Sequence, residues 1–280
     1  MKTIAFIGLG VMGSLMAANL QAAGFTVQSY DLNRKGNRKS ARDAADGADA
    51  LITMLPDGDA VRDAVLDALP ALKRGAVVVD MSSSDPAATR ALGKALEAKG
   101  VDMVDAPVSG AKFKAKDGTL AIMAGGEREP FAKVLPVLQK LGNQIFHVGP
   151  LGAGHAVKAL NNYLGAAGTL AGFEALLVAQ AFGLDPVPML DAINASTGRN
   201  STTVRKIPQD VLTGAFASGF KLALMTKDVA IAAELARGLG VPAPFLKETL
   251  KHWRAAQKKL PRDADHTEIY KYQRRGIKRR

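Results

Sequence analysis

A lysine and two asparagines open a helix that otherwise looks buried. In the segment 152–163, GAGHAVKALNNY, Lys158 and Asn162 are four residues apart and share one helical face, with Asn161 beside them. A lysine whose pKa is lowered by burial or by nearby cations can take a proton from an alcohol and return it to a carbonyl. Asn162 would hold the amine or the hydroxyl. Spacing alone leaves open that Lys158 is an ordinary surface lysine.

His155 lies three residues before Lys158 and is a second candidate for proton transfer, because imidazole titrates near neutrality. The alternative, which we favour, is a polar residue of the first helical turn.

The beginning of the chain contains a glycine turn typical of dinucleotide-binding proteins. In KTIAFIGLGVMGSLMAANL, an apolar strand-like run and a helical pattern flank Gly8, Gly10 and Gly13. Gly8 permits a tight turn, Gly10 lets the backbone approach a pyrophosphate, and Gly13 allows close helix–strand packing. The helix N-terminus adds N–H groups and partial positive charge. We expect these glycines to bind the cofactor together with the residues between them, Leu9, Val11 and Met12.

Asp31 ends a second strand-like run, where a carboxylate would accept hydrogen bonds from an adenosine ribose. A carboxylate there favours NAD, because it repels the ribose phosphate of NADP. Four basic residues follow closely, and any of them could pair with that phosphate: Arg34, Lys35, Arg38 and Lys39. NAD is the expected cofactor and NADP the alternative.

The first 150 residues alternate apolar runs with helical patterns, which indicates a doubly wound sheet. The runs lack clean alternation, as expected of parallel strands buried on both faces. Strands are predicted at 3–7, 26–30, 50–54, 76–80, 102–106, 120–124 and 144–147. Helices are predicted at 11–23, 59–71, 87–99 and 129–139.

Several of these strands end in residues that could contact a ligand, since doubly wound folds bind ligands at the carboxyl ends of their strands. The residues expected to line the cofactor are Thr53, Leu55, Pro56 and Ser82. Ser109 and Gly110 follow a later strand, and their hydroxyl and backbone N–H groups could hold a carboxylate. A plain turn is the alternative at that position.

The segment between Asp31 and the strand predicted at 50–54 is short, polar and basic until Ala41. A crossover between parallel strands needs a dozen or more residues, usually with a helix. One crossover fits, formed by about 40–47, whereas the two of a complete Rossmann half do not. We therefore expect one strand–helix unit to be shortened or missing beside the adenine pocket.

After residue 150 no strand pattern appears, and helices are predicted at about 155–182, 186–195, 207–212, 222–238 and 243–258. We predict a dinucleotide-binding domain at 1–150 and an all-helical substrate and oligomerisation domain at 151–280, which starts with a long interdomain helix. Small residues on several faces of this helix suggest burial between domains or subunits. A homo-oligomer, dimer or tetramer, is expected.

Composition excludes several classes of site. The chain has no cysteine, so it has no disulfide and no thiolate nucleophile, which fits a reducing compartment. Its four histidines show no ligand spacing, and no metal site is expected. We find no charged-then-apolar leader, and Glu174 interrupts the best apolar stretch, so no membrane segment is expected. The expected location is the cytoplasm.

The net charge of +11 is partly a property of the last ten residues, KYQRRGIKRR, which carry six of the positive charges. Such charge can attract nucleic acid or anionic surfaces, or it can belong to a solvated terminus. We favour the terminus, because no aromatic–basic interleaving accompanies the charge, and we expect no nucleic-acid or membrane partner.

Three separated motifs resemble the β-hydroxyacid dehydrogenases, particularly 3-hydroxyisobutyrate dehydrogenase-like members. They are FIGLGVMGSLMAANL, DAPVSG followed by GTLAIMAGG, and GAGHAVKALNN; a fourth element, MTKD, ends at Asp228. The resemblance covers nearly the whole chain. It implies an NAD(P)-dependent oxidoreductase that interconverts a small β-hydroxyacid and its semialdehyde. Within it, Lys158 would be the general acid/base, Asn161, Asn162, Ser109 and Gly110 would bind substrate, and Lys227 would contact the cofactor.

Two departures from the family pattern are visible. Ala111 and Lys112 follow VSG where the family usually has a second glycine, and the segment after Asp31 is shorter than usual. Two alternatives stay open. One is an imine reductase on the same scaffold, against which Lys158 argues. The other is a non-catalytic, dehydrogenase-like protein whose basic tail binds an anionic partner.

Overall fold

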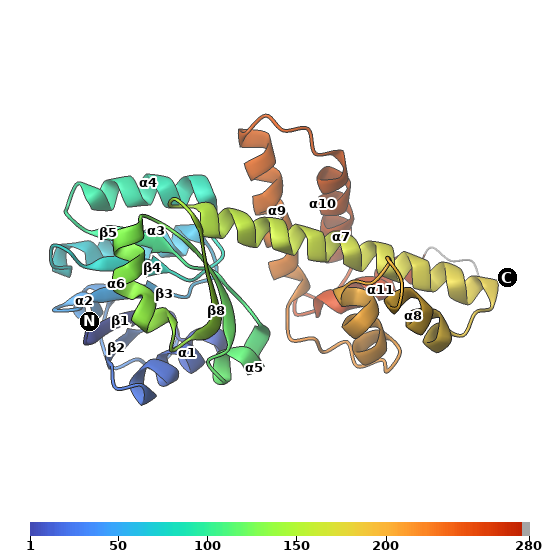
Figure 1. Ribbon diagram of the computed structural model, residues 1–280, viewed down its shortest axis with the longest axis horizontal. Helices are drawn as coiled ribbons and strands as arrows, with labels where there is room; N and C mark the ends of the chain where they lie inside the picture. The colour runs from blue at the N-terminus through green and yellow to red at the C-terminus, as the bar shows by residue number, and fades with distance from the viewer. Residues whose placement is uncertain (276–280) are drawn as a thin grey trace. The chain divides into compact units, whose positions relative to one another are not determined.

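The computed structural model of the protein describes residues 1–275 (Figure 1). The chain forms two compact units, Met1–Lys158 and Ala159–Arg280. The first unit is a sheet with helices on both faces, and the second is helical. The domains predicted at 1–150 and 151–280 stay a prediction. Half of the basic C-terminal segment, residues 276–280, lies outside the described residues.

The first unit contains an eight-stranded sheet in the order β2-β1-β3-β4-β5-β7-β6, with β8 paired to β7. The strands are β1 (Thr3–Ile7), β2 (Thr26–Tyr30), β3 (Ala50–Thr53), β4 (Val77–Asp80), β5 (Asp102–Asp105), β6 (Val108–Ser109), β7 (Leu120–Gly125) and β8 (Gly142–Gly149). Strands β1 to β5 are parallel, whereas β7 runs antiparallel to β5 and β6. The predicted fold class is confirmed. The antiparallel direction of β7 and the two-residue strand β6 were not predicted.

Six α-helices cover the two faces of this sheet. They are α1 (Val11–Ala22), α2 (Ala41–Ala45), α3 (Gly58–Ala68), α4 (Pro86–Glu97), α5 (Ala111–Lys116) and α6 (Arg128–Leu138), and a 3₁₀ turn, η1 (Leu69–Ala71), follows α3. Successive side chains of a strand point to opposite faces. Strand β1 therefore gives Ile4 and Phe6 to the core under α1, α5 and α6. It gives Ala5 and Ile7 to the core under α2, α3 and α4.

Local sequence explains where several of these helices begin. The side chains of Ser40, Asp57 and Asp85 accept N–H groups from the first turns of α2, α3 and α4. Such capping satisfies donors that have no partner inside the helix. Helix α1 starts differently, because its N-cap residue is Gly10 and no side chain caps it within the described part of the chain.

Strand β2 is the outermost strand on its side of the sheet, as the short segment after Asp31 predicts. Within residues 1–275, the side chain of Asn37 occupies part of the free edge. The Ser29 N–H donates to Asn37 Oδ1 at 2.7 Å, and Asn37 Nδ2 donates to the Val27 carbonyl at 2.9 Å. A Cβ on Gly36 would lie 2.3 Å from the Ser29 carbonyl oxygen, so this close approach requires glycine. A folded-back loop thus protects the edge that the missing strand would cover.

The second unit is built from helices packed around one core. They are α7 (Ala153–Phe182, which begins in the first unit), α8 (Pro186–Asn194), the π-helix η2 (Thr202–Val211), α9 (Leu222–Gly238), α10 (Pro244–Gln257), the 3₁₀ turn η3 (His266–Glu268) and α11 (Ile269–Arg274). Phe173 of α7 and Trp253 of α10 are among its fully buried side chains. By length and composition alone α7 could cross a membrane, a test that core helices of soluble proteins also pass.

Two helical segments of the second unit differ from the prediction. Helix η2 begins five residues before the predicted start at Ile207. The earlier start was not predicted because four of these five residues are polar or basic and show no apolar stripe. Helix α11 was not predicted at all. It has only six residues, too few for a periodic pattern.

Lys206 of η2 is a buried cation of the second unit. It is 5% exposed, and its ammonium group donates to Thr169 Oγ1 at 2.6 Å. Burial, helped by repulsion from Arg205, lowers the pKa of Lys206 to about 8, although Asp265 and Asp210 act in the opposite direction. The folded protein therefore holds this proton less tightly than the unfolded chain does.

The buried lysine should make stability depend on pH. Between about pH 8 and pH 10.5 the unfolded chain keeps a proton that the folded chain has released, so stability rises with pH across this window. Below pH 8 Lys206 is charged in the folded and the unfolded state, and burying this charge lowers the free energy of unfolding by on the order of 3 kcal/mol. We expect Lys206→Met to be more stable than the parent at pH 7 by up to about that amount, with the difference fading toward pH 10.5. Urea unfolding at several pH values measures it, and parallel pH profiles would refute the prediction.

Candidate active site

The three glycines of the first turn differ in whether the fold would tolerate a side chain at their positions. Gly8 has a φ of +100°, and a Cβ there would lie 2.3 Å from the Met54 carbonyl oxygen. A Cβ on Gly13 would lie 2.0 Å from the Gly8 carbonyl oxygen. Gly10 has an ordinary φ of −61°, and its Cβ would meet no described atom within 4 Å. The fold therefore requires Gly8 and Gly13, whereas the open space at Gly10 suits the close approach of a ligand.

The start of α1 offers unpaired donors to that space. No described side chain caps this helix, so its first-turn N–H groups are available to an anion, which the helix dipole also favours. Leu9 and Met12 pack their side chains against the core. Val11 is exposed. Of the predicted cofactor residues in this turn, Leu9 and Met12 can therefore serve a ligand mainly through their backbones.

Asp31 ties the glycine turn to the end of β2. Its Oδ2 accepts the Leu9 N–H at 2.6 Å, and its Oδ1 accepts the Asn33 N–H at 2.8 Å. An ionised carboxylate has about four acceptor positions, so it can accept further hydrogen bonds from ribose hydroxyls. Arg34, Lys35, Arg38 and Lys39 are all exposed. Arg38 lies 3.7 Å from Asp43 in a surface ion pair.

The loops after β3 and β4 are joined by a buried carboxylate that sequence reasoning missed. Thr53 Oγ1 and the Ser82 N–H each donate to Asp80 Oδ1 at 2.9 Å. The Leu55 N–H donates to Ser82 Oγ at 2.9 Å. Thr53 is completely buried and Ser82 nearly so, whereas Pro56 is exposed. The structure thus brings Thr53, Leu55 and Ser82 together. The hydroxyl of Thr53 is engaged by the Asp80 carboxylate.

Ser109 and Gly110 lie at the junction of β6 and α5. Ser109 is half-buried and pairs with Ala121 of β7. Gly110 has a φ of +147°, and Ala111 adopts a φ of +57°, in the left-handed region that favours glycine. Ala111 therefore keeps the backbone shape that a second glycine would adopt, at a cost of roughly 1 kcal/mol. This departure from the family pattern adds a methyl group without abolishing the turn.

Lys158 is half-buried in the second turn of α7. Asn161 and Asn162 follow on the same continuous helix, and Asn162 is one turn further along the face of Lys158. His155 is 1% exposed and lies between two buried carboxylates, those of Asp80 and Asp105. This burial removes His155 from the surface that a substrate could reach.

Asn162 belongs to a chain of polar groups within the second unit. Its Nδ2 donates to Asp228 Oδ2 at 2.5 Å, while its Oδ1 accepts from Asn161 Nδ2 at 3.1 Å. The ammonium of Lys227 lies 3.4 Å from Asp228 Oδ1. Sequence reasoning proposed Lys227 but did not assign a role to Asp228. The position of Asp228 at the end of the MTKD element was the signal from which a role for it could have been predicted.

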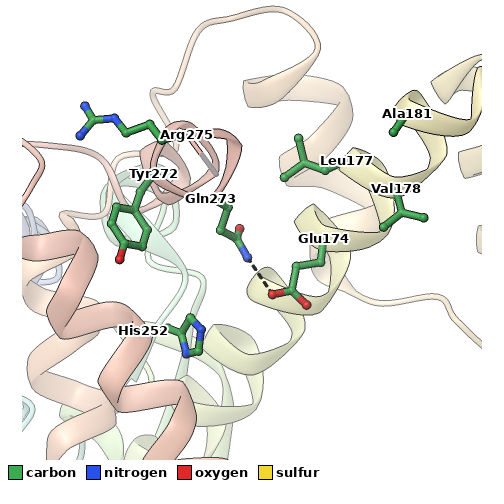
Figure 2. A pocket seen from close by; sticks show the side chains of 8 residues that line it. All are labelled: Glu174, Leu177, Val178, Ala181, His252, Tyr272, Gln273 and Arg275. Carbon is green, nitrogen blue, oxygen red and sulfur yellow. Dashed lines mark hydrogen bonds between the residues drawn. The ribbon is translucent and has the colours of Figure 1, made fainter. Parts of the chain in front are cut away.

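A hollow of about 760 Å³ in the second unit contains none of the predicted site residues (Figure 2). It is lined by Glu174, Leu177, Val178, Ala181, His252, Tyr272, Gln273 and Arg275. Gln273 Nε2 donates to Glu174 Oε1 across it at 3.5 Å.

Two family models match the chain almost end to end. One describes the NAD binding domain of 6-phosphogluconate dehydrogenase and matches residues 3–149. The other describes the NAD-binding of NADP-dependent 3-hydroxyisobutyrate dehydrogenase and matches residues 152–273. The 2-(hydroxymethyl)glutarate dehydrogenase of Eubacterium barkeri is 39% identical over 259 residues, which cover 86% of this chain and 85% of the relative.

Solved structures show the same architecture. Mycobacterium tuberculosis 3-hydroxyisobutyrate dehydrogenase, determined with L-serine, matches with a TM-score of 0.91 and 32% identity over 98% of this chain and 99% of that one. A Streptomyces aurantiacus imine reductase matches with a TM-score of 0.63 and 19% identity over 98% of this chain and 99% of that one, a likeness of fold alone.

The glycine turn, the strand ends and the helical second half define an NAD(P)-dependent oxidoreductase that acts on CH–OH groups. The chain belongs to the β-hydroxyacid dehydrogenase family, whose members interconvert hydroxyacids and semialdehydes. The predicted family, reaction class and NAD(P) cofactor are confirmed. The individual site residues stay predictions.

The glycines allow folding and cofactor binding to be separated. We expect Gly10→Ala to keep its stability and to bind NAD or NADP at least about tenfold more weakly, because its methyl group occupies the open space. We expect Gly13→Ala to lose about 2 kcal/mol or more of stability, because its methyl group overlaps the Gly8 carbonyl. Urea unfolding and fluorescence titration with the reduced cofactors measure the two effects. Unchanged affinity in a folded Gly10→Ala protein would contradict the assignment.

Proposed function

We propose that the protein interconverts a small β-hydroxyacid and its semialdehyde with Lys158 as the general acid/base. The observation that carries this proposal is the shared helical face of Lys158 and Asn162 near the start of α7. NAD(P), when bound, would supply the acceptor for the hydride of the alcohol carbon. The side chain of Lys158, as a neutral amine, takes the hydroxyl proton. In the reverse direction its ammonium group returns the proton to the carbonyl oxygen.

Asn162 is well placed to orient the reacting groups. Its amide nitrogen is bound to Asp228, which fixes the direction of its oxygen. That oxygen accepts one hydrogen bond from Asn161 and has a second lone pair. We propose that this lone pair accepts from the Lys158 ammonium group or from the substrate hydroxyl.

The proposed substrate is a small carboxylate. Ser109 supplies a half-buried hydroxyl beside the positive-φ turn at Gly110, and both are proposed to hold the substrate carboxylate. Asp31 supports NAD over NADP, since its carboxylate would face a ribose phosphate. Lys227 is proposed to contact the cofactor. We propose the cytoplasm as the location of the enzyme.

The general acid/base role is tested by Lys158→Ala. We expect turnover of the best hydroxyacid to fall by about 10²- to 10⁴-fold, because the proton loses its acceptor. Cofactor affinity should stay within about twofold, a change below 0.5 kcal/mol. An exposed lysine of α4, changed in Lys94→Ala, is the control and should keep full activity. A panel of hydroxyacids assayed with NAD and NADP finds the substrate, and full activity of Lys158→Ala would refute the mechanism.

We also propose that the enzyme is a homo-oligomer, at least a dimer. Large apolar side chains are exposed along α7: Leu160, Leu164, Val178 and Phe182. A second copy covering them would remove this apolar surface from water. Light scattering at micromolar concentration is expected to give twice the chain mass or more. A monomer, with the same mass for Leu164→Glu, would contradict this proposal.

A further inference from the structure

The first turn of α7 is fastened to a buried carboxylate at the end of β5. The Gly152 N–H donates to Asp105 Oδ1 at 2.7 Å, and the His155 N–H donates to Asp105 Oδ2 at 2.7 Å. These N–H groups lie at the start of a helix, where they have no partner inside the helix and where the dipole favours an anion. Because both carboxylate oxygens are engaged, they fix the position and the rotation of the helix start.

Glycines make this close attachment possible. A Cβ on Gly154 would lie 2.2 Å from the Met123 carbonyl oxygen and 2.9 Å from Asp105 Oδ2. A Cβ on Gly125 would lie 2.5 Å from Asp105 Oδ1. Any side chain at either position would push the helix away from the strand end. Gly125 of DGTLAIMAGG and Gly154 of GAGH are therefore explained by the approach of α7 to Asp105.

The ring of His155 lies against this attachment. Its Nδ1 is 2.9 Å from Thr89 Oγ1 and 3.6 Å from Asp105 Oδ2. Thr89 Oγ1 donates its own proton to the Asp85 carbonyl at 3.0 Å, so it accepts from Nδ1–H. Nε2 lies 3.5 Å from Asp80 Oδ2 and has no hydrogen-bond partner among the described residues. The hydrogen bond to Thr89 therefore fixes the orientation of the ring.

Asp80 connects this ring to the loops that are proposed to line the cofactor. Asp80 and Asp105 are register partners on the neighbouring parallel strands β4 and β5, so their carboxylates emerge side by side. Both side chains are completely buried. Asp80 also holds Thr53 and the Ser82 N–H. The start of α7 and the loops after β3 and β4 thus share one buried polar network.

Burying two carboxylates and an imidazole costs desolvation free energy that an apolar contact would not cost. A network of this kind gives fixed geometry rather than additional stability, since apolar side chains of similar volume often pack equally well. Lys158 lies three residues after His155, on the same side of α7. Because Lys158 is within one helical turn of His155, the network that fixes His155 also fixes the backbone position of Lys158.

We propose that Asp105 and His155 are positioning residues for the reaction. Together they hold the start of α7 so that the Lys158 amine keeps a fixed position relative to the loops after β3 and β4. This inference rests on the proposed role of Lys158 as general acid/base. It assigns no contact with substrate or cofactor to Asp105 or His155.

The test compares His155→Leu and Asp105→Asn with Lys158→Ala. For both positioning variants we expect cofactor affinity within about threefold of the parent and kcat lower by at least about tenfold. The pH profile of kcat should shift, because the lysine changes its surroundings. Amide hydrogen exchange at residues 152–156 should accelerate in Asp105→Asn. Should His155→Leu not fold, Thr89→Val, which removes the acceptor of Nδ1 and the hydrogen bond to the Asp85 carbonyl, is expected to show a smaller change in the same direction.

A control separates positioning from general loss of stability. Val134→Ala opens a cavity in the core under α6 and should lower stability while leaving kcat and its pH profile unchanged. A parental kcat and pH profile in His155→Leu, together with an inactive Lys158→Ala, would overturn the inference and leave the proposed function standing. Full activity of Lys158→Ala would instead refute the proposed function, and the inference with it.

Discussion

The structure depends on two hydrogen bonds between the first turn of α7 and the Asp105 carboxylate. Helix α7 is thirty residues long, and its later turns supply Phe173 and Leu176 to the core of the second unit. Lys158 and Asn162 belong to the first turns after this attachment. The position of Lys158, one helical turn after His155, is therefore set by this attachment to the end of β5.

Much of the first unit could be predicted because its signals are local. The glycine turn and the apolar strands each determine a structure within a few residues. The absence of one strand–helix unit was predicted from the small number of residues between Asp31 and the next strand. The use of Asn37 to cover the edge of β2 could not be predicted, since it depends on how a loop folds back across three-dimensional space. The antiparallel direction of β7 is non-local in the same way.

The candidate site shows the same division. Residue types and spacing, together with the resemblance of the motifs, led to the proposals for Lys158, Asn162 and the glycines. They did not distinguish Gly10, which the fold leaves free, from Gly8 and Gly13, which the backbone requires. The buried acids were also missed, because the importance of Asp80 and Asp105 arises from strand register, which places them next to each other. A sequence pattern identifies groups that could react, whereas the network that orients them becomes visible only when the strands are paired.

The proposed chemistry depends on one step, in which the Lys158 amine exchanges a proton with the substrate oxygen while the hydride is transferred between substrate and cofactor. Chemical rescue tests this claim most directly. Small primary amines added to folded, cofactor-binding Lys158→Ala should restore turnover in proportion to their concentration, with rates that depend on the pKa of each amine. The parent enzyme should not respond to them. Turnover of Lys158→Ala that stays at its residual level with every amine tested, while cofactor and substrate still bind, would contradict the claim.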